Sequence, residues 1–297
     1  MCIRDRNEDI IIVPDGVLGY LPFEILLKDK PKKLNNFHTY PYFLKEHNLS
    51  YCYSATLLDQ MINRKHTTAP TKSSLAIAPF YEGDIKELIA RVDTMQLIAL
   101  RNDTLQALQF SGEEAAIVAK MTQGDQLIGK AASLQSFKNR ASEYKMLHLS
   151  THGIANDKIG DYAYLAFGDN ENTAEQYEKL YIRDIYNLPL NADMVVLSAC
   201  NTAYGKLQKG EGVISMARAF AYAGAKSIIT THWSVDDAST GVLMEDFYRQ
   251  LIQYGSTKDE ALRASKLNFI KNNKGLKAHP YFWAAFVAIG DMKPIQN

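Results

Sequence analysis

Cysteine is scarce in this chain of 297 residues, which contains only Cys2, Cys52 and Cys200. Three cysteines are too few, and odd in number, for a framework of disulfide bonds. Their scarcity favours a reducing compartment, and we expect a cytoplasmic protein. No group of His, Cys and carboxylate residues has the spacing of a zinc site, so we expect neither a metal nor another cofactor.

The chain also lacks an excess of charge, with 33 Lys and Arg against 33 Asp and Glu. No segment is dense in Lys or Arg, so nucleic acid is not an expected partner. No apolar run approaches about 18 residues and no signal peptide begins the chain, so no membrane partner is expected. With 46% hydrophobic residues, the composition is that of a globular protein with a sizeable core.

The first six residues, MCIRDR, are unlike the rest, and a strand-like run, DIIIVP, follows with almost no lead-in. We therefore expect residues 1–6 to be a foreign or disordered start. We also expect the chain to be a fragment of something longer.

Apolar runs and turn signals alternate along the chain, most regularly after about residue 110. The strands predicted in this part are YKMLHLSTHG, MVVLSAC, AKSIITTHW and WAAFVAIGD. The predicted helices are SGEEAAIVAKM, EGVISMARAFAYAG, DDASTGVLMEDFYRQLIQYG and STKDEALRASKLNFIKNN. This alternation favours an α/β fold with a mostly parallel central sheet flanked by helices. MVVLSAC is too apolar to have a solvent-facing side, so it belongs at the centre of that sheet.

Local signals mark several helix ends. Ser111 with Glu114, and Thr257 with Glu260, have the spacing of capping boxes. A glycine stop signal ends the helix predicted at 211–223. The stretch before that helix, GKLQKGEG, lacks the Gly-Lys-Ser/Thr of a phosphate-binding loop, and we interpret it as a mobile loop.

Two apolar runs, about 50 residues apart, each end on a residue capable of acid–base or nucleophilic chemistry: His152 and Cys200. Ligands bind at the carboxyl ends of strands in an open parallel sheet, so neighbouring strands would bring both side chains into one crevice. A histidine base can take the proton of a thiol and leave the nucleophilic thiolate. The N–H groups of Gly153 and Cys200 would then stabilise a substrate oxyanion.

Each residue also has an ordinary structural interpretation. A cysteine that ends an apolar strand is often a small buried hydrophobe, and a histidine before glycine is often structural. The two together favour catalysis, because their spacing is that of caspase-type peptidases. His148 lies inside its strand, and His232 lies at a strand end beside Trp233 where it could line the crevice. The remaining histidines, His38, His47, His66 and His279, have no partner pattern.

Several motifs closely resemble the CHAT domain, a caspase-like cysteine peptidase family related to separase. They are MLHLSTHG, LSACNTAYGKLQKGEGVISMARAFAYAGAKSIITTHWSVDD and HPYFWAAFVAIGD, together with VPDGVLGYLPFEILL and YSATLLDQM nearer the start. The resemblance covers about residues 10–292. It implies a caspase-like fold with a degenerate (pseudo-caspase) first half, residues 7–104, and an active second half, residues 105–297.

By this resemblance His152 would be the general base, Cys200 the nucleophile and Gly153 part of the oxyanion hole. Family members often follow tetratricopeptide repeats, which this chain does not contain. SACNT stands where caspases have Gln-Ala-Cys, so cleavage after aspartate is not implied. Relatives in the wider group often favour a basic residue before the scissile bond, and Asp236 or Asp237 could bind it. The alternative is that one of these two carboxylates caps the following helix.

The sequence therefore predicts a regulated cysteine endopeptidase that cleaves a protein or peptide substrate. One alternative is an inactive caspase-like scaffold that binds a partner. Another is a non-peptidase hydrolase using Cys200, although the chain has no G-x-S-x-G elbow.

Overall fold

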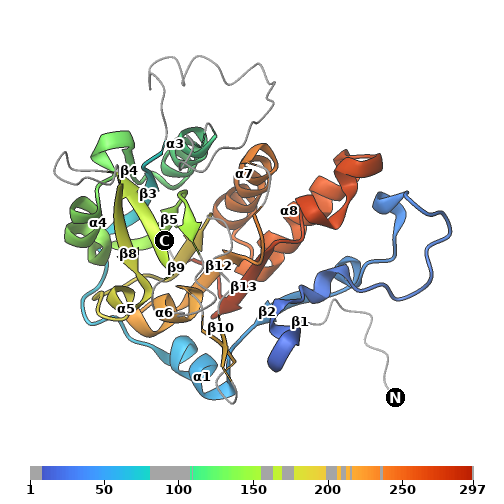
Figure 1. Ribbon diagram of the computed structural model, residues 1–297, viewed down its shortest axis with the longest axis horizontal. Helices are drawn as coiled ribbons and strands as arrows, with labels where there is room; N and C mark the ends of the chain where they lie inside the picture. Colours follow the sequence, from blue (N-terminus) through green and yellow to red (C-terminus); the bar gives the residue numbers. More distant parts are fainter. Residues whose placement is uncertain are drawn as a thin grey trace.

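The computed structural model describes residues 9–80, 108, 110–154, 163–168, 177–198, 206–208, 212–214, 216–234 and 237–295. Through these residues runs an eight-stranded sheet of order β1-β2-β13-β12-β9-β5-β3-β4 (Figure 1). Its strands, in chain order, are β1 (Asp9–Ile12), β2 (Asn48–Tyr51), β3 (Lys72–Ala78), β4 (Asp125–Ile128), β5 (Tyr144–Leu149), β9 (Met194–Leu197), β12 (Ser227–Thr231) and β13 (Phe286–Gly290).

Parallel pairing dominates this sheet, and β12 with β13 is its antiparallel pair within the described ranges. β9 lies between β5 and β12 and is parallel to both, and its four residues are all buried. The prediction of a central strand from its apolar run is therefore confirmed. A strand covered on both faces needs no polar side.

Helices form a layer on each face of the sheet (Figure 1). The layer that packs on the Leu147 and Leu149 face consists of α1 (Ala55–Asn63), α4 (Leu134–Arg140), α5 (Ile182–Ile185) and α6 (Met216–Ala223). The layer that packs on the Met146 and Val196 face consists of α3 (Ser111–Thr122), α7 (Asp237–Gln253) and α8 (Lys258–Asn272). Alternation along this part of β5 therefore places Leu147 and Leu149 in one core and Met146 in the other.

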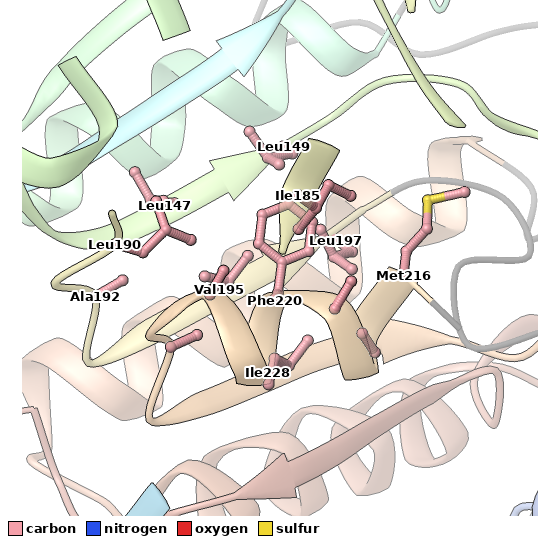
Figure 2. Packing of buried hydrophobic residues seen from close by; sticks show 14 of the residues in the cluster. Leu147, Leu149, Ile185, Leu190, Ala192, Val195, Leu197, Met216, Phe220 and Ile228 are labelled. Carbon is pink, nitrogen blue, oxygen red and sulfur yellow. The ribbon is translucent and has the colours of Figure 1, made fainter. Parts of the chain in front are cut away.

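Phe220 of α6 illustrates how the helices hold the sheet. Its ring is fully buried among side chains that include Val195 and Leu197 of β9 and Ile228 of β12 (Figure 2). Burying a side chain of this size contributes about 1.5–3 kcal/mol. The end of β9 is thus supported by packing just before the residues that are expected to do chemistry.

Two smaller sheets accompany the main one. β6 (Gly153–Ile154), β7 (Tyr164–Gly168) and β8 (Tyr177–Tyr181) pair antiparallel in that order. β10 (Lys206–Gln208) pairs antiparallel with β11 (Gly212–Ile214).

The helix predicted at 211–223 begins later than expected. α6 starts at Met216 and ends before Gly224, whose φ of 130° suits the glycine stop signal. The first part of the predicted helix is instead β11, and the loop predicted before it contains β10. Val213 and Ile214 are β-branched and favour an extended backbone, which the helix-like periodicity concealed.

Of the two predicted capping boxes, one is confirmed. The Thr257 hydroxyl accepts a hydrogen bond from the Glu260 N–H, and the Glu260 carboxylate accepts one from the Thr257 N–H. The box at Ser111 and Glu114 is wrong. The Ser111 hydroxyl instead donates to the Leu108 carbonyl at 2.7 Å, and Glu114 is turned into the core.

The predicted division at residues 104 and 105 falls outside the described residues, as do residues 1–6. Both therefore stay predictions. Strands from both predicted halves share the main sheet. From the first half, β3 lies between β5 and β4 of the second half, while β1 and β2 extend the opposite edge beyond β13.

Candidate active site

β5 and β9 are adjacent parallel strands, and their register pairs Leu149 with Leu197. His152 follows Leu149 by three residues, and Cys200 follows Leu197 by three. Cys200 itself lies outside the described residues. Both residues therefore follow, by the same number of positions, a pair of residues that lie opposite each other at the carboxyl edge of the sheet.

The His152 ring is half-buried against an aromatic wall. It meets the ring of Phe80 edge-on, with centroids 4.8 Å apart. Phe80 in turn lies 6.4 Å from the ring of Tyr177 in β8. Phe80 follows β3, the neighbour of β5, so the wall rises from the same carboxyl edge of the sheet.

The backbone around His152 is held from several sides. The Ser150 N–H donates to the Ile77 carbonyl at 2.8 Å, which continues the β3–β5 pairing past the end of the strand. The Thr151 hydroxyl donates to the Ala166 carbonyl, and the Ala166 N–H donates to the His152 carbonyl at 2.9 Å. The chain therefore leaves β5 along a fixed path into β6.

Gly153 is the first residue of β6 and is buried opposite Leu165 of β7. Asp237 is the first residue of α7, whereas Asp236 lies outside the described residues. α7 follows β12, the other parallel neighbour of β9. The oxyanion role of Gly153 and the substrate role of the two aspartates stay predictions.

His148 has partners that its sequence context did not indicate. Its Nε2 lies 3.0 Å from Oε1 of Glu114, and its Nδ1 lies 3.2 Å from the Tyr248 hydroxyl. The Nε2–Oε1 contact does not meet the geometric criteria of a hydrogen bond. The Ser150 hydroxyl donates to the other carboxyl oxygen of Glu114 at 3.0 Å. All four side chains are buried.

His232 follows β12 at the same carboxyl edge, as its sequence position predicts. Its backbone N–H donates to the Ala285 carbonyl at 2.9 Å, while its ring nitrogens have no hydrogen-bond partner among the described residues. Burial lowers the pKa of His232 to about 4, and Glu24 and Lys266 perturb it in opposite directions. The ring is therefore neutral near pH 7.

The Glu24 carboxylate is a further buried group, which the sequence analysis did not identify. It pairs with the Lys266 ammonium of α8 at 2.9 Å and accepts a hydrogen bond from the Tyr51 hydroxyl. Burial, followed by the Glu24 charge, raises the pKa of Tyr51 far above its ordinary value. The signal for this cluster is a charged residue in the apolar run LPFEILL.

No cluster of three or more His, Cys, Asp or Glu in the described part of the chain could hold a metal ion. Among the same residues, no helix combines the length and apolar character needed to cross a membrane.

The sheet order and the two helical layers define a caspase-like α/β fold. Gingipain R, an Arg-specific cysteine proteinase, superposes on 84% of this chain and 55% of its own with a TM-score of 0.52 and 12% identity. Separase in the Saccharomyces cerevisiae separase–securin complex superposes on 86% of this chain and 14% of its own with a TM-score of 0.50 and 13% identity.

This chain belongs to the CHAT domain family, whose match extends over residues 3–291. It is also similar to tetratricopeptide repeat protein 28 of Mus musculus, with 30% identity over 107 residues. That alignment covers 36% of this chain and 4% of the mouse protein. The chain thus corresponds to a small part of that curated relative.

Proposed function

We propose that this chain is the catalytic part of a cysteine endopeptidase, with Cys200 as nucleophile and His152 as general base. The single observation that carries the proposal is the parallel β5–β9 register, in which the two residues stand at equal offsets from the Leu149–Leu197 pair. Such adjacent carboxyl ends are where open α/β sheets bind their ligands. Membership of the CHAT domain family and the caspase-like fold support the same assignment.

In the first half of the reaction, His152 takes the proton of the Cys200 thiol. The thiolate attacks the scissile carbonyl carbon, a C–S bond forms, and the carbonyl oxygen becomes an oxyanion. The N–H groups of Gly153 and Cys200 stabilise that charge. When the C–N bond breaks, the imidazolium of His152 gives its proton to the leaving amine.

In the second half, His152 takes a proton from water, which attacks the thioester carbonyl. The C–S bond then breaks, the carboxylic acid leaves, and the thiolate returns. The edge-on contact with Phe80 limits rotation of the His152 ring and so favours catalysis by keeping it oriented.

For the specificity pocket we propose Asp237, with Asp236 as the second candidate. Both residues follow β12, which is adjacent to β9 in the sheet, and Cys200 follows β9. The two aspartates and the proposed nucleophile therefore follow neighbouring strands. A carboxylate there would pair with a basic side chain before the scissile bond. The arginine specificity in the name of gingipain R supports this choice of substrate.

The natural substrate would be a protein or peptide. Similarity to a tetratricopeptide repeat protein supports a full-length polypeptide in which such repeats accompany this chain and regulate it. We further propose a cytoplasmic location and a reaction without cofactor, and that residues 7–104 are structural while residues 105–297 carry the chemistry.

An electrophilic peptide probe with arginine or lysine next to the reactive group tests the proposal. Wild-type protein should be labelled on Cys200, and Cys200→Ala should not be labelled. His152→Ala should be labelled and should hydrolyse peptides at least about a hundredfold more slowly, the usual scale for loss of a general base.

Cys52→Ala is the matched control, because Cys52 is buried and lies past the end of β2, away from β9 in the sheet. It should be labelled like the wild type. Labelling that persists in Cys200→Ala would identify another nucleophile. A folded wild-type protein that is not labelled at all would favour the inactive scaffold.

A further inference from the structure

Glu114, His148 and Tyr248 form a buried polar chain that joins three elements. Glu114 comes from the first turn of α3, His148 from the last but one position of β5, and Tyr248 from α7. Their side chains are all buried. The two helices, α3 and α7, pack against each other on this face of the sheet (Figure 1). None of the three is exposed enough to touch a substrate.

The His148 ring lies between the other two side chains. Burial, and then the charge of Glu114, holds the pKa of Tyr248 well above its usual range, so the hydroxyl keeps its proton. That hydroxyl is hydrogen-bonded to Nδ1 of His148 at 3.2 Å. Nε2 of the same ring faces the Glu114 carboxyl group at 3.0 Å. The ring is held between a hydroxyl and a carboxyl group.

The same carboxyl group reaches the strand end that carries His152. Its second oxygen accepts the hydrogen bond of the Ser150 hydroxyl at 3.0 Å. The next residue, Thr151, is tied to Ala166 of β7. Successive residues of an extended chain point to opposite faces, so the segment before His152 is fixed from both sides of the sheet.

Stability alone is a poor explanation for this arrangement. Replacing buried ionic or polar groups by apolar ones of similar size is often neutral or stabilising. The Glu114 side chain is only 1% exposed, so burying its carboxyl group carries a desolvation penalty that an apolar side chain would not have. Its bond to Ser150, two residues before His152, is the contact that an apolar side chain could not replace.

We propose that Glu114 is a positioning residue: through Ser150 and His148 it sets the path of the strand end and hence the orientation of His152. This inference rests on the proposed His152–Cys200 dyad. Tyr248 extends the same chain to α7, the helix that begins at Asp237. Glu114 therefore links the helix that would carry the specificity residue with the strand that would carry the base.

The rate of Cys200 alkylation by iodoacetamide as a function of pH tests this proposal. It is measured by mass spectrometry of the Cys200 peptide in the folded 297-residue protein. In wild type, a well-placed His152 keeps the thiolate populated well below the ordinary thiol pKa of about 8.5. In Glu114→Gln the midpoint should move toward that ordinary value. Peptide turnover should fall about tenfold to a hundredfold with KM nearly unchanged, as expected for a misplaced base.

Glu113→Gln is the matched control, because Glu113 neighbours Glu114 on α3 but does not contact the polar chain in the described structure. It should keep the wild-type alkylation profile. Ser150→Ala removes the Glu114–strand contact with a smaller change and should shift the profile in the same direction as Glu114→Gln. This second variant decides the question if Glu114→Gln does not fold.

The outcomes separate this inference from the proposed function. If His152→Ala shifts the profile while folded Glu114→Gln and Ser150→Ala keep it, Glu114 is only structural and the inference is wrong. A wild-type profile that already has the ordinary midpoint, and that His152→Ala leaves unchanged, overturns the dyad and the inference together. Equal shifts in Glu113→Gln and Glu114→Gln would also count against a specific role for Glu114.

Discussion

Lys266 and Glu24 form a 2.9 Å ion pair, with only 1% of each side chain exposed, although they come from opposite ends of the chain. Lys266 belongs to α8 on one helical layer, and Glu24 belongs to a short turn between β1 and β2. The pair joins the first segment of the chain to the last long helix, and both of its charges perturb the pKa of His232. The contribution of this ion pair to the free energy of unfolding can be measured directly.

Glu24→Gln should lower the free energy of unfolding by about 3–5 kcal/mol, because it leaves the buried Lys266 ammonium without its counter-charge. Urea titration followed by circular dichroism measures the change. Glu46→Gln is the control, since it breaks an ion pair with Lys28 that is exposed to solvent. The control should leave the midpoint unchanged. Equal midpoints for Glu24→Gln and wild type would show that the buried pair contributes nothing.

His232 should make the protein less stable in mild acid. Its folded pKa is about 4, against an ordinary 6.5, because burial disfavours the charged ring. Between these values the unfolded chain binds a proton that the folded chain does not, so stability falls as pH is lowered through this window. The largest expected loss is about 3 kcal/mol.

Urea titrations at several pH values between 4 and 7 compare wild type with His232→Leu. The variant should lose less stability than wild type over this range, whatever its stability at pH 7. Parallel curves for the two proteins would mean that His232 titrates alike in the folded and unfolded chain.

Cys200 should react with iodoacetamide faster than Cys52 near pH 7. Burial raises the pKa of the Cys52 thiol and also shields it from the reagent. The proposed base would lower the pKa of Cys200. Peptide mapping after brief labelling gives the two rates. Faster labelling of Cys52 in the native protein would argue strongly against the dyad.

Asp237→Asn should lower kcat/KM for arginyl substrates about a hundredfold, equal to about 3 kcal/mol. A basic side chain would then enter a pocket without its counter-charge, whereas neutral substrates would lose much less. Paired assays with arginyl and neutral peptides measure the difference. The same loss for every substrate would mean that Asp237 caps α7 and does not select the substrate.

The sequence alone predicted those elements whose signals are local. The apolar run of β9 required burial on both faces, and Thr257 with Glu260 specified the start of α8 within a single turn. The choice of His152 also rests on a short pattern, a strand end followed by glycine. Such signals depend on sterics and hydrogen bonds between residues only a few positions apart.

Tertiary structure decided the partners of the buried polar side chains. Ser111 and Glu114 have the capping-box spacing, just as Thr257 and Glu260 do. The Glu114 side chain nevertheless turns inward, because its partners His148 and Ser150 lie beneath α3. Glu24 finds Lys266 only once α8 has crossed the sheet near β2. Whether a carboxyl group points to solvent or to a buried partner depends on what the fold places beside it. A partner more than thirty positions away leaves no local pattern in the sequence.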